Sequence, residues 1–188
     1  MAPEDVSCDK KGALEEGAAL IHSDEASFRQ DSTLHSTWSR RGCQPEIPVS
    51  GARKSIKVLG CVEIRTGRFL YNRKEVFNAR TYIEFLEHVA RAYYPQKVYH
   101  VQDNASYHRQ ADVKAWFSEN RHWWRTYYLP PYSPEFNATE RIWYHVRKTG
   151  THNRYFVTVE ELFDTLTSVF RSTQRRPEQI RGYLAPFS

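Results

Sequence analysis

Three acidic side chains, Asp24, Asp103 and Glu140, are the residues whose placement along the chain could support chemistry. Asp24 and Asp103 each follow a short, mostly apolar run, Ala18 to Ser23 and Val98 to Val101, as acids at the carboxyl ends of buried strands do. In an open α/β sheet, ligands bind at this end of the strands. Converging carboxylates repel one another unless a cation lies between them, and hard oxygen ligands favour Mg²⁺ or Mn²⁺. The spacing therefore indicates a divalent-metal site.

Each acid also has an ordinary structural explanation. Asp24 and Asp103 are suited to ending strands, and Glu140 lies three residues after Asn137, the spacing of a helix capping box. Spacing alone leaves both interpretations open.

The sequences around the three acids are more specific. They read Ser23-Asp24-Glu25, then Gln102-Asp103-Asn104-Ala105-Ser106-Tyr107-His108, and then Leu129-Pro130-Pro131-Tyr132-Ser133-Pro134-Glu135-Phe136-Asn137-Ala138-Thr139-Glu140-Arg141-Ile142-Trp143. These segments resemble the three acidic motifs of DDE transposases, most closely the mariner-type superfamily in its bacterial insertion-sequence branch. In that family the second motif is similar to D-N-A-x-x-H and the third to L-P-x-Y-S-P-x-L-N-P-I-E-x-x-W. The resemblance extends from about residue 18 to residue 172.

The resemblance implies an RNase H-like fold in which Asp24, Asp103 and Glu140 are the catalytic, metal-binding triad. Two Mg²⁺ or Mn²⁺ ions would support hydrolysis of a DNA phosphodiester, followed by strand transfer to target DNA. The neighbouring acids Glu25 and Glu135 are set aside, because the family's catalytic positions fall beside them. Asn104 and His108 follow the second Asp closely enough to orient the groups around it, although an ordinary polar loop is the alternative.

This sequence departs from the family pattern in two ways. Phe136 replaces the usual Leu, and Ala138-Thr139 replaces Pro-Ile, but all three carboxylates are kept. The family's N-terminal helix-turn-helix DNA-binding modules do not fit into the 17 residues before the first motif, so we expect a catalytic domain, a truncation, or one half of a split reading frame. An upstream helix-turn-helix chain or domain is then an expected partner, together with a second copy of this chain in a homodimer.

The elements expected to hold the triad combine strands and helices. The apolar patterns predict strands at 18–23, 56–64, 69–76, 98–101 and 123–129, a further strand near 27–38, and helices at 79–94, 109–120, 137–149 and 158–173. Thr158 and Glu161 predict a capping box at the start of the last helix. We expect an α/β fold, an RNase H-like mixed sheet flanked by helices, with an inserted basic β-hairpin. The domain would span residues 18–175, between an N-terminal arm at 1–17 and a tail at 176–188.

Composition fits one folded domain. The 188 residues are 40% apolar, 14% aromatic and 26% charged, which disfavours disorder throughout. No apolar run approaches the roughly 20 residues that span a bilayer, and the N-terminus lacks the pattern of a signal peptide. Three cysteines without C-x-x-C spacing indicate neither a disulfide framework nor a zinc site. We expect a soluble protein of the bacterial cytoplasm, associated with the nucleoid.

Positive charge is concentrated in one segment. Residues 40–74 hold nine basic and two acidic side chains, a larger excess than the net charge of +5 for the whole chain. Since Lys and Arg neutralise phosphates without reading sequence, this basic hairpin region, 38–76, is the expected contact with double-stranded DNA, at transposon ends and target. Trp38-Ser39-Arg40-Arg41-Gly42 also resembles the W-x-x-R-G element that precedes a hairpin in the family. The expected DNA-binding residues are Trp38, Arg40, Arg41, Arg53, Lys54, Lys57, Arg141, Arg147 and Lys148.

Three other functions compete with this one. A non-catalytic remnant would only bind DNA or dimerise, and its DNA affinity would ignore Mg²⁺ and triad mutations. A hydrolase of small phosphoesters would use the same metal site. A histidine-containing metallohydrolase is disfavoured, because His22, His100, His108 and His145 lie near the acids without zinc-binding spacing such as H-E-x-x-H.

Overall fold

The structure, a computed structural model, describes residues 12–13, 15–31, 34–43, 46–48, 51, 54–131 and 133–187. Its strands are β1 (Ala19–Arg29), β2 (Ser55–Glu63), β3 (Phe69–Lys74), β4 (Val98–Gln102) and β5 (Trp124–Tyr128). Its α-helices are α2 (Ala79–Tyr93), α3 (Ala111–Asn120), α4 (Thr139–Val146), α5 (Val159–Gln174) and α6 (Pro177–Leu184). Short helical turns at Ser106–Arg109, Pro134–Phe136, Arg147–Thr151 and Ala185–Phe187 complete the described elements.

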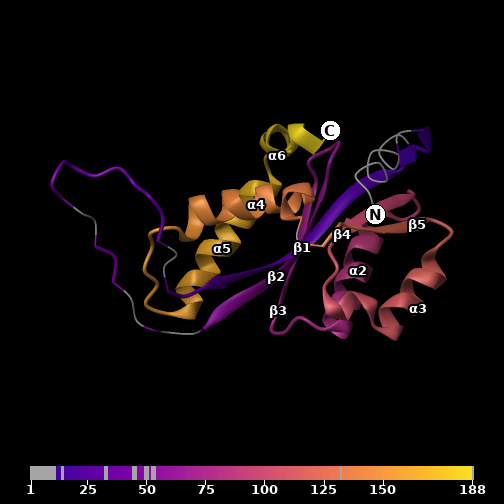
Figure 1. Cartoon of the computed structure of the whole chain (residues 1–188), viewed down its shortest axis with the longest axis horizontal. Coiled ribbons are helices and arrows are strands. Elements are labelled where there is room, and N and C mark those ends of the chain that lie inside the picture. The colour runs from indigo at the N-terminus through magenta and orange to yellow at the C-terminus, as the bar shows by residue number, and fades with distance from the viewer. Residues whose placement is uncertain are drawn as a thin grey trace.

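The five strands form one mixed sheet in the order β3-β2-β1-β4-β5 (Figure 1). β2 runs antiparallel to β1 and β3, whereas β4 is parallel to both β1 and β5. The mixed sheet flanked by helices confirms the expected fold class. The β2–β3 hairpin is confirmed as well, but it is not an insertion, because its two strands make up one side of the central sheet.

β1 is longer than the sequence predicts. Its parallel pairing with β4 covers only Ala19 to His22, but its antiparallel pairing with β2 continues to Arg29. Asp24 and Glu25 therefore lie within the strand and do not end it. Residues 34–40 are not in a strand, so the further strand expected near 27–38 is wrong beyond its first three residues.

Helices cover both faces of the sheet and enclose two cores. On one face, α2 and α3 bury Leu86, Val113 and Trp124 together with residues of β1 and β2. On the other face, α4, α5 and α6 bury a larger cluster around Trp143 and Phe170 (Figure 1). The sheet is thus the central layer, with a layer of helices packed on each face, as in other domains built of packed layers.

The ends of the helices follow their capping residues. Asn78 and Thr81 form a complete capping box at the start of α2. At α5, the Thr158 side chain accepts from the backbone N–H of Glu161, while the Glu161 carboxylate accepts from Val157 instead of closing the box on Thr158. α4 ends at Val146, earlier than expected, and continues as a π-helical turn.

The C-terminal residues expected as a tail are part of the folded core. Ile180, Leu184 and Phe187 are buried beside α4 and α5. Gly67, in the turn between β2 and β3, has φ +71°, and a Cβ there would lie 2.4 Å from the Pro177 carbonyl oxygen. The hairpin turn and α6 therefore approach each other too closely for any other residue at position 67. None of the described helices is long and apolar enough to cross a membrane.

Candidate active site

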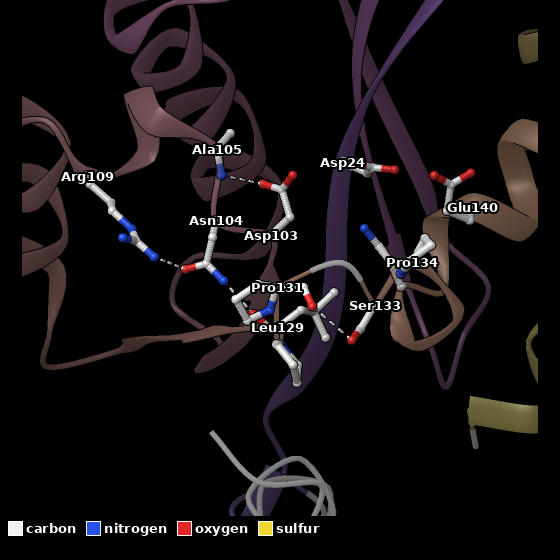
Figure 2. Close-up of a pocket in the computed structure, with 12 residues that line it drawn as sticks. Asp24, Asp103, Asn104, Ala105, Arg109, Leu129, Pro131, Ser133, Pro134 and Glu140 are labelled. Atoms are coloured by element: carbon white, nitrogen blue, oxygen red, sulfur yellow. Dashed lines mark hydrogen bonds between the residues drawn. The ribbon is translucent and has the colours of Figure 1, made fainter.

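The three acids of the sequence motifs line one pocket of about 490 Å³ (Figure 2). Asp24 comes from the middle of β1, just beyond the end of its pairing with β4. Asp103 directly follows β4, and Glu140 lies in the first turn of α4. Figure 2 shows the Asp24 carboxylate pointing toward Glu140, with Asp103 on the other side of Asp24. The structure thus brings together the three side chains that the sequence analysis selects.

The start of α4 is fastened to β1 by three hydrogen bonds. Asn137 Nδ2 donates to the Ser23 carbonyl at 3.3 Å, and Thr139 Oγ1 donates to the His22 carbonyl at 2.9 Å. The Ala138 backbone N–H donates to His22 Nδ1 at 3.3 Å. These contacts hold the first turn of α4 against the strand that carries Asp24, and so they place Glu140 beside it. The Ala138-Thr139 departure from the family pattern therefore supplies a hydrogen bond that Ile at position 139 could not make.

Asp24 is held by an indole. Trp143 Nε1 donates to Asp24 Oδ2 at 3.1 Å. Gly60 of β2 lies directly opposite Asp24 in the sheet, and a Cβ at residue 60 would meet Trp143 Cη2 at 2.5 Å. Only glycine at position 60 leaves room for the indole to lie over the strand and reach the carboxylate.

The environment of Asp24 disfavours its negative charge. Burial raises the pKa of Asp24 well above its usual value, and the carboxylates of Glu140, Glu25 and Asp103 raise it further. None of the described residues forms an ion pair with Asp24 or Glu140. A cation bound in the pocket would therefore favour the ionised form of Asp24.

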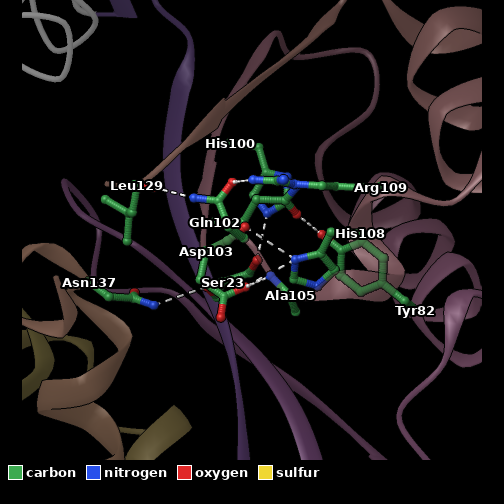
Figure 3. A network of polar contacts seen from close by, with 11 residues as sticks. Ser23, Tyr82, His100, Gln102, Asp103, Ala105, His108, Arg109, Leu129 and Asn137 are labelled. Carbon is green, nitrogen blue, oxygen red and sulfur yellow. Dashed lines mark hydrogen bonds and ion pairs between the residues drawn. The ribbon is translucent and has the colours of Figure 1, made fainter. Parts of the chain in front are cut away.

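Asp103 is in the opposite situation. Burial alone would raise its pKa, but the hydrogen bonds from His108 and from the Ala105 backbone N–H outweigh burial and lower it. His108 Nδ1 lies 3.1 Å from Asp103 Oδ1, and the Ala105 N–H lies 3.0 Å from the same oxygen (Figure 3). His108 is only 2% exposed and packs against the Tyr82 ring, so its orientation is fixed. Asp103 thus stays ionised more readily than Asp24.

Asn104 connects the pocket walls. Its amide donates to the Leu129 carbonyl, and its Oδ1 accepts from Arg109 Nη2 at 2.6 Å (Figure 2). Asn104 therefore ties the loop after β4 to the end of β5, which supports the expectation that it orients the site.

Glu25, which the sequence analysis sets aside, also lies near the site. Because successive side chains of a strand alternate between faces, Glu25 points to the α2 side of the sheet, away from Trp143. Ligand atoms of Glu25, Asp103 and His108 all lie within 4.8 Å of one another. Burial raises the pKa of Glu25, and the charge of Asp103 adds to this effect. Asp103 is thus shared between the triad pocket and a second group of possible metal ligands.

Residues 19–163 match the sequence profile of a family described as DDE superfamily endonuclease. The chain belongs to the DDE superfamily of endonucleases. Among curated relatives, this DDE chain is similar to the insertion element IS630 uncharacterized 39 kDa protein of Shigella sonnei, with 26% identity over 145 residues. That match covers 75% of this chain and 42% of the relative, so the chain spans less than half the length of that relative.

Solved structures of the mariner transposase Mos1 share the fold. The Mos1 paired-end complex with Mn matches with a TM-score of 0.66 and 15% identity, covering 96% of this DDE chain and 58% of the Mos1 chain. The Mos1 catalytic domain matches with a TM-score of 0.62 and 14% identity, covering 96% of this DDE chain and 84% of the Mos1 domain. These likenesses confirm the RNase H-like fold.

The pocket of this DDE chain fits divalent metal. Its donors are carboxylate oxygens, which Mg²⁺ and Mn²⁺ prefer. Burial raises the pKa of Asp24 and the neighbouring carboxylates raise it further, two effects that a bound cation would offset. Asp24, Asp103 and Glu140 would hold the metal, which when bound stabilises charge on the phosphate and on the oxygens entering and leaving it.

The basic residues expected to contact DNA do not gather at the pocket. Trp38, Arg40 and Arg41 lie exposed on a segment that projects beyond α5, away from the start of α4 (Figure 1). Lys54 is exposed just before β2, and Lys57 Nζ donates to the Glu75 carbonyl. On and after α4, Arg141 and Lys148 are exposed, whereas Arg147 lies over the Phe28 ring. Arg53 is outside the described residues.

Four residues that shape the site were not among the expected ones: Gly60, Trp143, Asn137 and Thr139. Trp143 and Asn137 belong to the third motif, so their place in the family pattern was the available signal. For Gly60 and Thr139 the sequence gave no such signal, because their roles depend on contacts with residues more than 80 positions away in the chain.

Proposed function

We propose that this chain is the catalytic unit of a transposase, which cleaves DNA phosphodiesters with Mg²⁺ or Mn²⁺ and joins the freed 3′ end to target DNA. The observation that carries the proposal is the meeting of Asp24, Asp103 and Glu140 in one pocket at the edge of the sheet where α/β proteins bind ligands. Membership of the DDE superfamily supports the same chemistry.

The protein's own side chains have distinct roles in this reaction. Asp24 and Asp103 bind the metal from neighbouring strands, and Glu140 completes the site from α4. Trp143 orients Asp24, while His108 and the Ala105 N–H orient Asp103. Asn104 keeps the loop that carries Asp103 against the end of β5.

The substrate is double-stranded DNA, including the transposon ends and the target. Trp38, Arg40, Arg41, Arg53, Lys54, Lys57, Arg141, Arg147 and Lys148 are its proposed contacts. A homodimer and a helix-turn-helix chain or domain are the proposed partners, supported by the family resemblance and by the relative's greater length. The proposed place of action is the bacterial nucleoid.

Nicking of a labelled supercoiled plasmid tests the proposal. With Mn²⁺ or Mg²⁺, we expect the wild type to nick the plasmid and both Asp103→Ala and Glu140→Gln to lose at least 100-fold in rate, since each removes a metal ligand. Glu135→Gln is the matched control, because Glu135 is an exposed acid near the same pocket and should keep wild-type activity.

Two results would contradict the proposal. Equal nicking by the wild type and both triad variants would assign the activity to a contaminant. If none of the proteins nicks DNA and Mn²⁺ titration gives the same affinity for all of them, the chain is a DNA-binding or dimerising remnant.

A further inference from the structure

A groove outside the carboxylate pocket runs between α3 and β5. This α3–β5 groove has a volume of about 650 Å³ and is lined by Lys114, Phe117, Ser118, Arg121, Trp124, Arg125, Thr126, Tyr127 and Tyr128. β5 is an edge of the sheet, because it pairs only with β4 among the described strands. The lining therefore holds three cationic side chains, several aromatic ones and no carboxylate.

Charge is segregated around α3. Lys114, Phe117, Ser118 and Arg121 recur at intervals of three and four residues, so they occupy one face of the helix. Asp112 and Glu119 are both about half a turn away from that face, at roughly 100° per residue. The helix thus presents its bases to the groove and its acids elsewhere.

Two of the three cations in the groove have no acidic partner among the described residues. Arg125 pairs with Glu16 at 3.1 Å and lies over the Tyr99 ring. Within the described part of the chain, no carboxylate forms an ion pair with Lys114 or Arg121, and both side chains are exposed. They are available to an anion.

Consecutive residues of the chain line the groove and the carboxylate pocket. Tyr128 lines the groove, and the next residue, Leu129, lines the pocket. Arg109, another residue of the pocket wall, lies two residues before α3 begins and carries positive charge toward Tyr128. Along α3, Lys114 and Arg121 lie about 10 Å apart, close to the rise of three base pairs at about 3.4 Å each.

We infer that the α3–β5 groove binds the phosphate backbone of the DNA duplex as it leaves the carboxylate pocket on the α3 side, with Lys114 and Arg121 as the contacts. The inference rests on the proposed function for the identity of the ligand. Phe117 and Tyr127 are partly buried, so they form walls of the groove and do not serve as open stacking surfaces. The groove is separate from the basic residues of the projecting segment and of α4.

Binding of a fluorescent 30-base-pair duplex in EDTA, followed by anisotropy over a range of salt concentrations, tests the inference without any cleavage. Each phosphate contact contributes about 0.9 to the slope of log K against log salt. We expect Lys114→Ala/Arg121→Ala to reduce the slope by about 1.8, which weakens binding up to roughly 60-fold near 0.1 M salt. Arg171→Ala/Arg175→Ala is the matched control, because it removes two exposed charges at the end of α5 and should leave the slope unchanged.

Conservative exchanges separate charge from folding. The charge-keeping double variant Lys114→Arg/Arg121→Lys should keep the wild-type slope. This variant and Lys114→Ala/Arg121→Ala should both keep the wild-type circular dichroism spectrum. An unchanged slope for Lys114→Ala/Arg121→Ala overturns the inference, as does equal weakening by the α5 control.

The outcome is independent of catalysis. If groove variants lose DNA binding while the wild type does not nick DNA, the groove stands and the proposed activity fails. If the wild type nicks DNA in a triad-dependent way and the groove variants bind normally, the activity stands and the groove inference fails. If the groove variants lose affinity for a single-stranded probe but not for the duplex, the assignment of a duplex as the ligand is likewise overturned.

Discussion

The indole of Trp143 reaches Asp24 because residue 60 has no side chain. Trp143 is fully buried among Phe28, Phe69 and Phe170, so its position is set by the core and not by the pocket. Its N–H then occupies one oxygen of Asp24 and leaves the other for metal. At the scale of single residues, packing in the core thus fixes the direction of a proposed metal ligand.

Replacing Trp143 by Phe tests this link. The variant keeps an aromatic ring but loses the donor, and a hydrogen bond to a charged group contributes about 1.5–3 kcal/mol. We expect the Kd for Mn²⁺, measured by isothermal titration calorimetry, to rise about 10-fold, the lower end of the effect of losing a contact that orients a ligand. Leu184→Ala is the control: it leaves a cavity in the same core cluster but keeps the three rings that pack against the indole, so it should lower stability and leave Mn²⁺ affinity unchanged.

Gly60→Ala approaches the same contact from the other side. The new methyl group would lie 2.5 Å from the indole, and overpacking of this kind costs about 1–3 kcal/mol. Mn²⁺ affinity should fall together with stability, since the displaced indole no longer meets Asp24. Wild-type Mn²⁺ affinity in both Gly60→Ala and Trp143→Phe would show that the indole does not position the carboxylate.

Elements differ in how well the sequence alone predicts them. α2 and α5 were predicted almost to the residue, because their apolar residues recur at helical spacing and capping residues mark their starts. The extension of β1 through Arg29 was not predicted. It depends on pairing with residues of β2 that lie 26 to 42 positions later in the chain. The three acids were found from local motifs, whereas the Trp143 and Asn137 contacts span 119 and 114 residues and required the fold.

α6 shows the limit of periodicity. Its eight residues contain a glycine and only two fully buried side chains, Ile180 and Leu184, so its apolar face is too short to be recognised from the sequence. Its place comes from the helices and the hairpin turn that it covers.

A single exchange distinguishes a packed helix from a tail. Leu184→Ala should lower the free energy of unfolding by about 2–5 kcal/mol, because Leu184 is fully buried and its removal leaves a cavity. Gln179→Ala, on the exposed side of the same helix, should change it by less than about 0.5 kcal/mol. Urea denaturation followed by tryptophan fluorescence measures both, and equal stability of the two variants would mean that α6 is not docked.

Across the whole molecule, the pocket joins the two helical layers. Asp24 and Glu140 belong to the side covered by α4, whereas Asp103 is oriented by His108, which packs against α2. A cation held by all three carboxylates therefore bridges the layers, and its binding should stabilise the entire domain and not the pocket alone.

The pH dependence of stability measures how much the ionised Asp24 destabilises the metal-free fold. The pKa of Asp24 is raised by burial and by neighbouring carboxylates, so in the metal-free protein its contribution to stability is fully present below about pH 4 and is lost as the pH rises through its folded pKa. Asp24→Asn removes this loss and keeps an oxygen for the Trp143 N–H. Without metal, the variant should therefore be more stable than the wild type at pH 7, and the difference should vanish near pH 4. The lowered pKa of Asp103 acts in the opposite sense but is common to both proteins, so it cancels in the comparison.

Added Mn²⁺ should reverse the order of stability at pH 7. It should raise the free energy of unfolding of the wild type by about 2.7 kcal/mol at 100 times its Kd and leave that of Asp24→Asn nearly unchanged. Thermal unfolding at several pH values, with EDTA or Mn²⁺, gives all of these quantities. If the wild type is instead more stable than Asp24→Asn in EDTA at pH 7, ionisation of Asp24 does not destabilise the metal-free fold.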